Sequence, residues 1–404
     1  MSRLARPAFA GGTPLRESYL HFHRPTLGRE EEREVVAVLR SGWLTTGERT
    51  KRFEREFAEF VGAPYAVGVT SCTAALHLAC LVSNLGPGDE VITTPMTFGA
   101  TANVIVHTGA RPVFVDVEPL SLNLDAHKIE AAVTRRTRAI LPVHYIGQPC
   151  DMRPIRAIAR RHGLAVIEDA AHAVETVYRG RSVGSISELT AFSFYATKNI
   201  TTGEGGMLTT KRKSLAERAR VLSLHGMSRD AWKRFSSTGF RHYAHVEAGF
   251  KYNMFDLQAA LGIHQLGRIE RLWRARRRAF DLYNRALAGI PGIRPLGQAE
   301  RPGDKNAYHL YVVRVDRREA RISRDGLMAA LWAENIGTGV HYRAVHLQPF
   351  YRKELGYRPG VCPVAEEASE EVLSLPFYPS IRRKDIEDVG GALRRIVDYS
   401  HRRK

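Results

Sequence analysis

The 404-residue chain has no long hydrophobic run and few cysteines. None of its apolar stretches reaches the roughly 18 residues that a membrane-spanning helix needs. The N-terminal stretch MSRLARPAFAGGTPLRES carries basic residues but no apolar core, so it does not have the pattern of a secretory signal. The four cysteines are scattered without CxxC spacing, which argues against a zinc site or a disulfide framework; they are Cys72, Cys80, Cys150 and Cys362. We therefore expect a cytoplasmic enzyme without a metal and without membrane insertion.

Acidic side chains are scarce relative to basic ones. The chain has 42 Asp and Glu against 60 Lys and Arg, which gives a formal net charge of +18. Such an excess raises the question of nucleic-acid binding. The basic residues are spread along the whole chain, however, and the densest clusters, at 271–280 and 394–404, fit exposed helix faces and belong to no recognisable nucleic-acid module. We expect no nucleic-acid partner. A positive field that attracts a phosphorylated substrate and an arginine-rich coding bias without function both stay open.

Short apolar runs alternate with helical patterns in the first half of the chain. The stretch 28–42 has acidic residues near its start and a glycine at its end, which is typical of an α-helix. The stretch 48–62 places Phe53, Phe57 and Phe60 on one face of a helix. Apolar strands that alternate with helices indicate an α/β protein with a mostly parallel sheet covered on both faces. Further helices are predicted at 71–86 and 97–109, and strands at 65–70, 89–94, 111–117 and within 137–147, 164–171 and 189–197.

The second half of the chain has a different pattern. A long helical stretch at 255–289 follows the last of these strands, and 290–306 has the composition of a loop. Beyond it, 307–316 and 324–342 suggest a smaller α+β domain. We therefore expect a large domain over 1–265 and a small domain over 266–404.

Polar residues follow two of the predicted strands, at the sheet edge where ligands of parallel α/β proteins bind. The strand at 65–70 turns into a helix at 70–73, whose hydroxyl groups and free N–H groups would make an anion site. The same residue types also cap ordinary helices. The strand at 164–171 contains Glu168 and Asp169, with His172 just after it. A buried carboxylate needs a positive or hydrogen-bonding partner, although a structural Asp that caps the next helix would satisfy the same pattern.

A single lysine, Lys198, lies in the stretch SFYATKNITTGEGG at 193–206. An exposed charged face would not need the glycines, and a core strand would not contain the lysine. Taken alone, Lys198 fits a solvated surface residue. An anion site, a strand-end acid and a lysine in a glycine loop are together what pyridoxal phosphate (PLP) requires, because the lysine forms a Schiff base with its aldehyde and the acid pairs with its ring nitrogen.

The chain resembles the PLP-dependent nucleotide-sugar aminotransferases of the DegT family over about residues 24–379. The resemblance implies the type I aminotransferase fold and a homodimer with shared active sites. It is carried by the motifs SGWLTTG (41–47), GVTSCTAALHL (68–78), GPGDEVITTPMTF (86–98), PVFVDV (112–117), EDAAHA (168–173), SFYATKNITTGEGG (193–206), GFKYNMFDLQAALG (249–262) and VHYRAVHLQPFY (340–351).

The resemblance assigns roles by position. Lys198 matches the family's Schiff-base lysine, and Asp169 matches the partner of the ring nitrogen. Phe98 stands where an aromatic ring stacks on the cofactor, and His172 stands at the family's Gln/His position beside the ring. The phosphate cradle is matched by Ser71, Cys72 and Ser193, and by Asn253 reaching in from a neighbouring subunit. Cys72 departs from the small residue, Ser or Thr that is more familiar there, which is harmless if only its N–H is used.

The same lysine distinguishes two activities that the family implies. Sugar dehydratase relatives carry His in its place, so Lys198 favours transamination. The implied cycle is ping-pong: L-glutamate gives its amino group to the cofactor and leaves as 2-oxoglutarate, and the amine then passes to a keto sugar while Lys198 moves the protons.

The substrate is less sharply defined by the sequence. The stretches 224–234, 251–261 and 336–351 look most like the branch that aminates C4 of UDP-4-keto sugars in lipid A or cell-envelope polysaccharide synthesis. Amination at C3 of a keto sugar or of a keto-cyclitol is the alternative, and a non-catalytic binding or regulatory protein on the same fold is a third. Candidate contacts to the substrate, which are equally compatible with domain packing, are Trp43, Thr45, His341, Arg343 and His346.

Overall fold

The computed structural model describes residues 6–228, 244–298 and 301–402. Its main sheet has seven strands in the order β1-β9-β8-β5-β4-β2-β3. β9 is antiparallel to both of its neighbours, and the other pairs are parallel, which confirms the predicted α/β class. β9 has no counterpart in the sequence prediction, because its run GMLTT is short and begins with a glycine. The strands are β1 (Tyr65–Val69), β2 (Glu90–Thr93), β3 (Arg111–Phe114), β4 (Thr137–Leu141), β5 (Ala165–Asp169), β8 (Leu189–Ser193) and β9 (Gly206–Thr210).

Helices pack against both faces of this sheet, so its strands are buried nearly throughout. Neighbouring residues of β5 illustrate this: Val166 belongs to the apolar cluster on one face and Ile167 to the cluster on the other. Such strands lack alternation because neither face meets water. The helices of this part are α1 (Arg29–Ser41), α2 (Glu48–Val61), α3 (Cys72–Val82), α4 (Gly99–His107), α5 (Ala126–Ala132), α6 (Met152–His162), α7 (Lys213–Ser223) and α8 (Asp256–Gly267).

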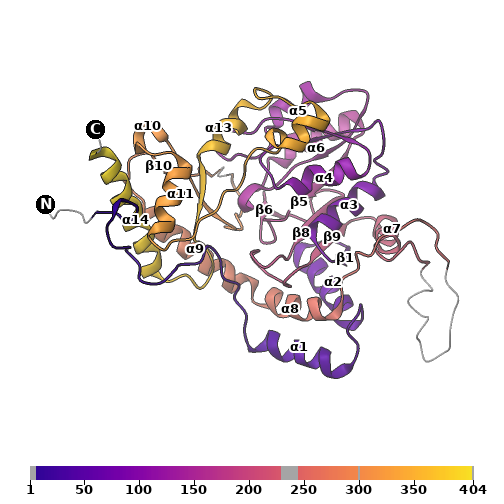
Figure 1. Ribbon diagram of the computed structural model, residues 1–404. Helices are drawn as coiled ribbons and strands as arrows, with labels where there is room; N and C mark the ends of the chain where they lie inside the picture. Colours follow the sequence, from indigo (N-terminus) through magenta and orange to yellow (C-terminus); the bar gives the residue numbers. More distant parts are fainter. Residues whose placement is uncertain (1–5, 229–243, 299–300, 403–404) are drawn as a thin grey trace.

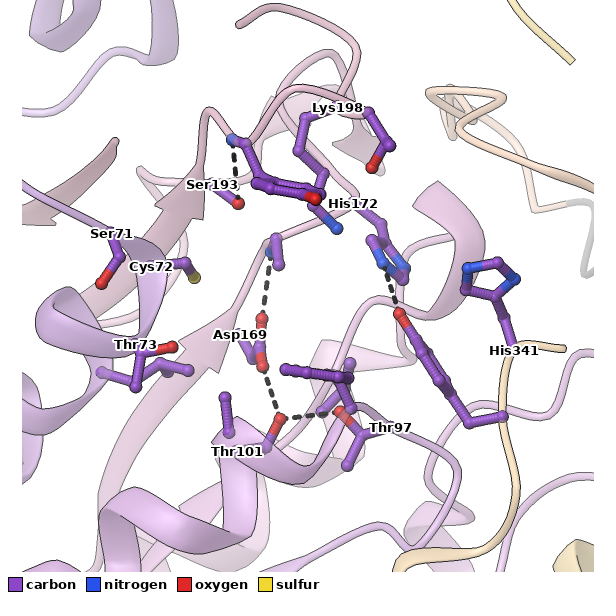
Figure 2. Close-up of a pocket in the computed structure, with 18 of the residues that line it drawn as sticks. Ser71, Cys72, Thr73, Thr97, Thr101, Asp169, His172, Ser193, Lys198 and His341 are labelled. Atoms are coloured by element: carbon purple, nitrogen blue, oxygen red, sulfur yellow. Dashed lines mark hydrogen bonds between the residues drawn. The ribbon is translucent and has the colours of Figure 1, made fainter. Parts of the chain in front are cut away.

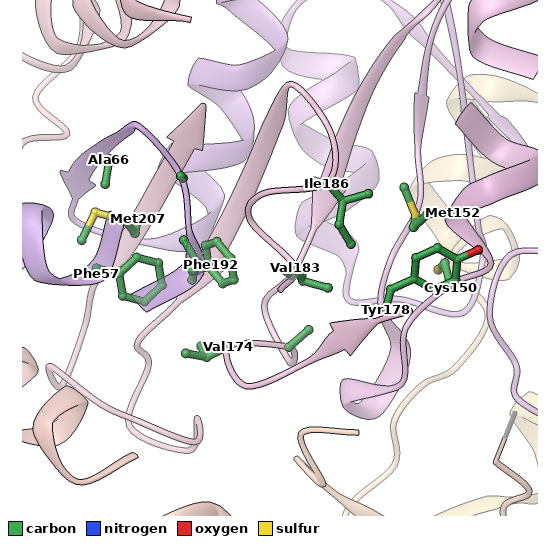
Figure 3. Close-up of a cluster of buried hydrophobic side chains, with 14 of the residues drawn as sticks. Phe57, Ala66, Cys150, Met152, Val174, Tyr178, Val183, Ile186, Phe192 and Met207 are labelled. Carbon is green, nitrogen blue, oxygen red and sulfur yellow. The ribbon is translucent and has the colours of Figure 1, made fainter. Parts of the chain in front are cut away.

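Aromatic rings of α2 anchor one of the two clusters (Figure 3). Phe53 and Phe57 are fully buried, and the Phe57 ring lies 5.0 Å from that of Phe192 on β8. Phe60 lies on the same side of the helix, as predicted, with its ring 6.5 Å from that of Phe57, and it keeps 38% of its surface exposed. It lies in the last turn of α2, at the border of the cluster rather than inside it.

The helical stretch predicted at 255–289 is two helices. α8 ends at Gly267, and α9 (Ile269–Ala286) follows after Arg268, whose backbone leaves helical geometry (φ −119°, ψ 14°). Gly267 weakens the helix there because glycine has a low helix propensity. The Arg268 side chain then donates to Thr26 and pairs with Glu31, which fixes α1 beside the break.

The C-terminal part is built on a three-stranded antiparallel sheet, β10-β11-β12. β10 (Ile293–Pro295) lies inside the predicted loop 290–306, and β11 (Tyr311–Val315) and β12 (Val372–Leu375) complete the sheet. Its helices are α10 (Arg317–Ala320), α11 (Arg324–Ala333), α12 (Pro349–Leu355), α13 (Pro363–Glu371) and α14 (Arg383–Arg402). Short elements elsewhere are β6 (Val177–Tyr178), β7 (Arg181–Ser182), η1 (Ala8–Ala10), η2 (Tyr145–Gly147) and η4 (Val345–Leu347).

The first residues of the described chain pack on this C-terminal part, and both termini lie on its side of the molecule (Figure 1). Arg16 forms ion pairs with Asp385 and Asp388 of α14, and Leu20 bridges to Ile336. The division at 265/266 stays a prediction. Across the part of the chain that the structure describes, no helix is both long and apolar enough to cross a membrane.

Candidate active site

A cavity of about 570 Å³ opens at the carboxyl ends of β5 and β8. Asp169 is the last residue of β5, Ser193 the last of β8, and Ser71 caps α3 just after β1. Figure 2 shows Ser71, Cys72 and Thr73 on one side of the cavity and His172 and His341 on the other. The structure thus brings eight predicted residues together around one space: Ser71, Cys72, Phe98, Asp169, His172, Ser193, Lys198 and His341.

The Lys198 side chain reaches the cavity from the turn after β8, where its backbone N–H donates to the Tyr195 carbonyl at 2.9 Å. Burial lowers the pKa of its amine to about 8, although the nearby Cys72 and Asp169 act in the opposite direction and raise it. Desolvation disfavours the charged form of an amine. At pH 7 about a tenth of Lys198 is therefore neutral and nucleophilic, whereas an ordinary lysine has less than about a thousandth in that form.

The glycines after Lys198 are explained by a close approach of two backbones. A Cβ atom on Gly206 would lie 2.4 Å from the carbonyl carbon of Ser71 and 2.6 Å from the amide nitrogen of Cys72. Only glycine lets β9 pass this close to the first turn of α3. Gly203 supports the turn itself, with a φ of +78° that favours glycine.

Asp169 is held by two donors on the floor of the cavity. Thr101 Oγ1 donates to Oδ2 at 2.8 Å, and the Ala171 amide donates to Oδ1 at 3.0 Å. Thr97 in turn bonds Thr101 at 2.7 Å. Burial raises the pKa of the Asp169 carboxyl, and these hydrogen bonds and the Lys198 charge oppose that rise. The neighbouring Glu168 points to the other face of the sheet, where it bonds His144 at 2.8 Å.

His172 and His341 form the opposite wall. His172 Nε2 lies 3.0 Å from the hydroxyl of Tyr342, and the Ile146 amide donates to Nδ1 at 3.2 Å. Burial and the nearby charge of Lys198 hold the pKa of His172 well below its usual range, so its ring is neutral. His341 Nδ1 bonds the Ser374 hydroxyl at 2.9 Å, and burial lowers its pKa to about 4.

These residues fit pyridoxal phosphate. The first turn of α3 has no acidic residue, and among the described residues nothing accepts from the amides of Cys72 and Thr73. Unsatisfied amides at a helix start bind phosphate. The Lys198 amine and the Asp169 carboxylate share the cavity with this helix start. The residue Phe98 is 65% exposed there, an unusual exposure for an aromatic residue that is explained if its ring stacks on a ligand.

Residues 25–394 match the profile of the DegT/DnrJ/EryC1/StrS aminotransferase family. The chain belongs to this family. SpsC of Bacillus subtilis, a spore coat polysaccharide biosynthesis protein, is 51% identical over 383 residues, 95% of this chain and 98% of SpsC. Spr1654 of Streptococcus pneumoniae in its PLP form is 32% identical with a TM-score of 0.87, over 95% of this chain and 99% of that one. DesI, solved in the presence of its TDP-sugar product, is 32% identical with a TM-score of 0.85, over 96% and 95%.

The chain is therefore an aminotransferase, and sugar aminotransferases are among its structural relatives. The family and the PLP form of Spr1654 indicate pyridoxal phosphate as the cofactor. The predicted type I aminotransferase fold is confirmed by the TM-scores. Within the described ranges, no three or more His, Cys, Asp or Glu side chains are grouped to hold a metal ion.

Three predicted residues of the aminotransferase form a separate cluster that does not line the cavity of the same subunit. Asn253 donates to Thr46 Oγ1 at 2.7 Å, and the Trp43 indole donates to the Thr46 carbonyl at 3.1 Å. The Thr45 carbonyl accepts from the amide of Asp256 at 3.2 Å. Trp43 is 45% exposed. Thr45 is exposed as well, whereas Asn253 is buried beneath them.

Two further predicted residues also lie elsewhere. His346 is fully buried and bonds Glu366 at 2.9 Å, so the structure does not bring it to the cavity. Arg343 is exposed and lines a separate hollow. Residues 229–234 of the stretch 224–234, which bears on the substrate branch, lie outside the described residues.

Sequence reasoning missed other residues that shape the cavity. Thr101 bonds Asp169 from α4, and only its position three residues after Phe98 hints at this. Tyr342 lines the cavity next to the predicted His341. His309 stacks on His172 with ring centroids 4.3 Å apart, although 137 positions of chain separate them and no local pattern links them.

Proposed function

We propose that this aminotransferase moves an amino group from L-glutamate to the 4-keto carbon of a nucleotide-linked sugar, with UDP as the nucleotide. The observation that carries the proposal is the buried Lys198 amine, which shares one cavity with the Asp169 carboxylate and the start of α3. A dehydratase would have His at that position. An intact lysine can take a proton from one carbon and return it to another.

Each residue has a proposed task. Bound pyridoxal phosphate would supply the electron sink. Lys198 moves protons at the substrate carbon, and Asp169 keeps the ring nitrogen protonated. Ser71, Cys72 and Ser193 hold the phosphate, and Phe98 covers the ring.

A separate basic hollow of about 600 Å³ supports an anionic nucleotide on the substrate. Arg343, Arg352, Lys353 and Arg358 line it, and none of the lining residues is acidic. The arginines have no acidic partner among the described residues. Arg343 directly follows Tyr342 of the cavity wall in the sequence. Guanidinium groups suit a diphosphate, and DesI was solved with a TDP-sugar product.

We also propose a homodimer with shared active sites. Large apolar side chains are exposed on and beside α1, where a second copy would cover them; they are Leu27, Val36, Leu39, Trp43 and Leu44. The cluster around Asn253 lies near them through Trp43. We place the partner's copy of that cluster at the phosphate end of the cavity. We propose a cytoplasmic enzyme of cell-envelope polysaccharide or lipid A synthesis, and the relative SpsC is a polysaccharide biosynthesis protein.

A two-stage absorption experiment tests the function. L-glutamate should bleach the yellow band of the PLP-loaded enzyme, and Lys198→Ala should not cycle. After glutamate is removed, five acceptors are added separately: UDP-4-keto-pentose, UDP-4-keto-6-deoxy-hexosamine, a TDP-4-keto sugar, a nucleotide-linked 3-keto sugar and a keto-cyclitol. Return of the colour with a UDP-4-keto sugar supports the proposal. Return only with a 3-keto sugar or a keto-cyclitol overturns it in favour of the alternative substrate class.

A further inference from the structure

The residue after Lys198 is buried outside the cavity. Lys198 lines the cavity, whereas Asn199 is 5% exposed and is not among the lining residues. The loop that carries both is closed at its base, because the Phe194 carbonyl accepts from the Thr202 amide at 2.9 Å. Among the described residues, the backbone of Asn199 makes no hydrogen bond. Its side chain therefore supplies the directional contacts that fix the loop next to Lys198.

Three protein groups saturate the Asn199 side chain. Its amide nitrogen donates to Glu175 Oε2 at 2.8 Å and to the Ala307 carbonyl at 2.8 Å, which uses both of its hydrogen atoms. The oxygen of the same amide lies 2.9 Å from Nδ1 of His309, so His309 is the donor in that bond. Segments far apart in the sequence thus converge on the residue next to Lys198.

The partners of Asn199 are held by bonds of their own. The Ala307 amide donates to the Gly147 carbonyl at 3.0 Å, and Arg276 of α9 donates to the His309 carbonyl at 3.0 Å. Buried polar groups that are linked in a satisfied network are held in one geometry. A displacement of Asn199 would therefore break several buried hydrogen bonds at once.

Glu175 is an unfavourable residue at its position if only stability matters. It is 3% exposed, and its Oε1 has no hydrogen-bond partner among the described residues. Burial raises the pKa of its carboxyl to about 7, although the charge of Arg276 and the bond from Asn199 act in the opposite direction. A buried carboxyl with an unpartnered oxygen is less stable than a well-packed apolar side chain of similar size. The contact with Asn199 is where a compensating role can lie.

Glu175 is not among the described residues that line the cavity, so it acts on the chemistry only through another residue. A reacting amine has to be placed accurately, since a misplacement of about 1 Å can slow a reaction about a hundredfold. We propose that Glu175 is a positioning residue that holds Lys198 in place through Asn199. The proposal rests on the role proposed above for Lys198, and it does not depend on the sugar or its nucleotide.

The test compares the affinities of the PLP-free enzyme for pyridoxal phosphate and for pyridoxamine phosphate. Both molecules have the same ring and phosphate, but pyridoxamine phosphate has no aldehyde for Lys198 to bond. A displaced Lys198 should therefore weaken the binding of pyridoxal phosphate alone. In Glu175→Ala we expect this affinity to fall about tenfold, and the affinity for pyridoxamine phosphate to stay within about twofold. Fluorescence titrations measure both.

Further variants check that Glu175 acts through Asn199. Asn199→Ala should have an effect similar to that of Glu175→Ala, and the double variant should be no worse than either. Glu175→Gln keeps an oxygen that accepts from Asn199 and should restore most of the affinity for pyridoxal phosphate. The matched control is Glu334→Ala, because Glu334 is a similarly buried carboxylate that accepts from the amides of Ala8 and Leu15 in the C-terminal part. It should lower thermal stability and leave both affinities unchanged.

Lys198→Ala distinguishes failure of this proposal from failure of the proposed function. If Lys198→Ala weakens pyridoxal phosphate selectively and Glu175→Ala does not, the positioning role is overturned and the role of Lys198 stands. Equal losses of the two affinities in Glu175→Ala, no recovery in Glu175→Gln, or additive effects in the double variant also overturn it. If Lys198→Ala has no selective effect, the proposed role of Lys198 fails, and the positioning role fails with it.

Discussion

Replacing Asp169 with Asn tests the chemistry of the cavity most sharply. The amide keeps the size of the carboxylate and can still accept from Thr101 at its oxygen. It removes the negative charge that would face the cofactor's ring nitrogen. Unit charges about 4 Å apart at an effective dielectric of about 20 attract by roughly 4 kcal/mol. That energy corresponds to about three units in the pKa of the ring nitrogen.

The assay is the single-turnover rate at which L-glutamate bleaches the loaded enzyme. Because the ring loses its protonated form, Asp169→Asn should slow this rate by up to about a thousandfold. Glu168→Gln is the matched control, since Glu168 is the next carboxylate on β5 but bonds His144 and the Ser187 amide on the other face. The control should lower thermal stability and leave the bleaching rate nearly unchanged. A rate for Asp169→Asn within about tenfold of the unmodified enzyme would refute the reasoning.

Four further changes probe other parts of the account. Gly206→Ala forces a Cβ atom into the first turn of α3 and should weaken PLP binding about tenfold or more by fluorescence titration. The rate at which the apoenzyme captures PLP should rise as the pH increases through about 8, because only the neutral Lys198 amine attacks; a flat profile contradicts this. Arg352→Ala should raise KM for the nucleotide sugar about tenfold and leave the glutamate half-reaction unchanged, whereas the exposed Arg278→Ala should change neither. Leu39→Asp should give a monomer in sedimentation experiments, because it places a charge on the apolar face of α1; a persisting dimer contradicts the proposed interface.

The sheet and the strand-end residues could be predicted because both follow from local patterns. Apolar runs mark β5 and β8, and Asp169 and Ser193 stand at their ends. The antiparallel β9 has no such pattern, because its run GMLTT is short and begins with a glycine. Its pairing with β1 joins residues far apart in the sequence. The break at Arg268 follows a single glycine, which is a weak signal on its own, and the side-chain contacts of Arg268 with Thr26 and Glu31 are far away in the sequence.

The same distinction applies within the site. Lys198 and Asp169 combine with glycine and strand patterns that point to one cofactor. His346 stands in a motif together with His341, but the η4 turn directs it into the core against Glu366. The hydrogen-bond chain from Ile146 to Tyr342 joins three separate segments, so only the folded chain shows it.

The position of the transferred nitrogen tests the central claim most directly. The enzyme is supplied with L-glutamate labelled with ¹⁵N and with a UDP-4-keto sugar, and the product is examined by NMR. We predict that ¹⁵N appears at C4 of the nucleotide-linked sugar and that Lys198→Ala gives no labelled product. A 4-keto sugar that stays unlabelled, with label found only at C3 when a 3-keto sugar is supplied instead, would contradict the account.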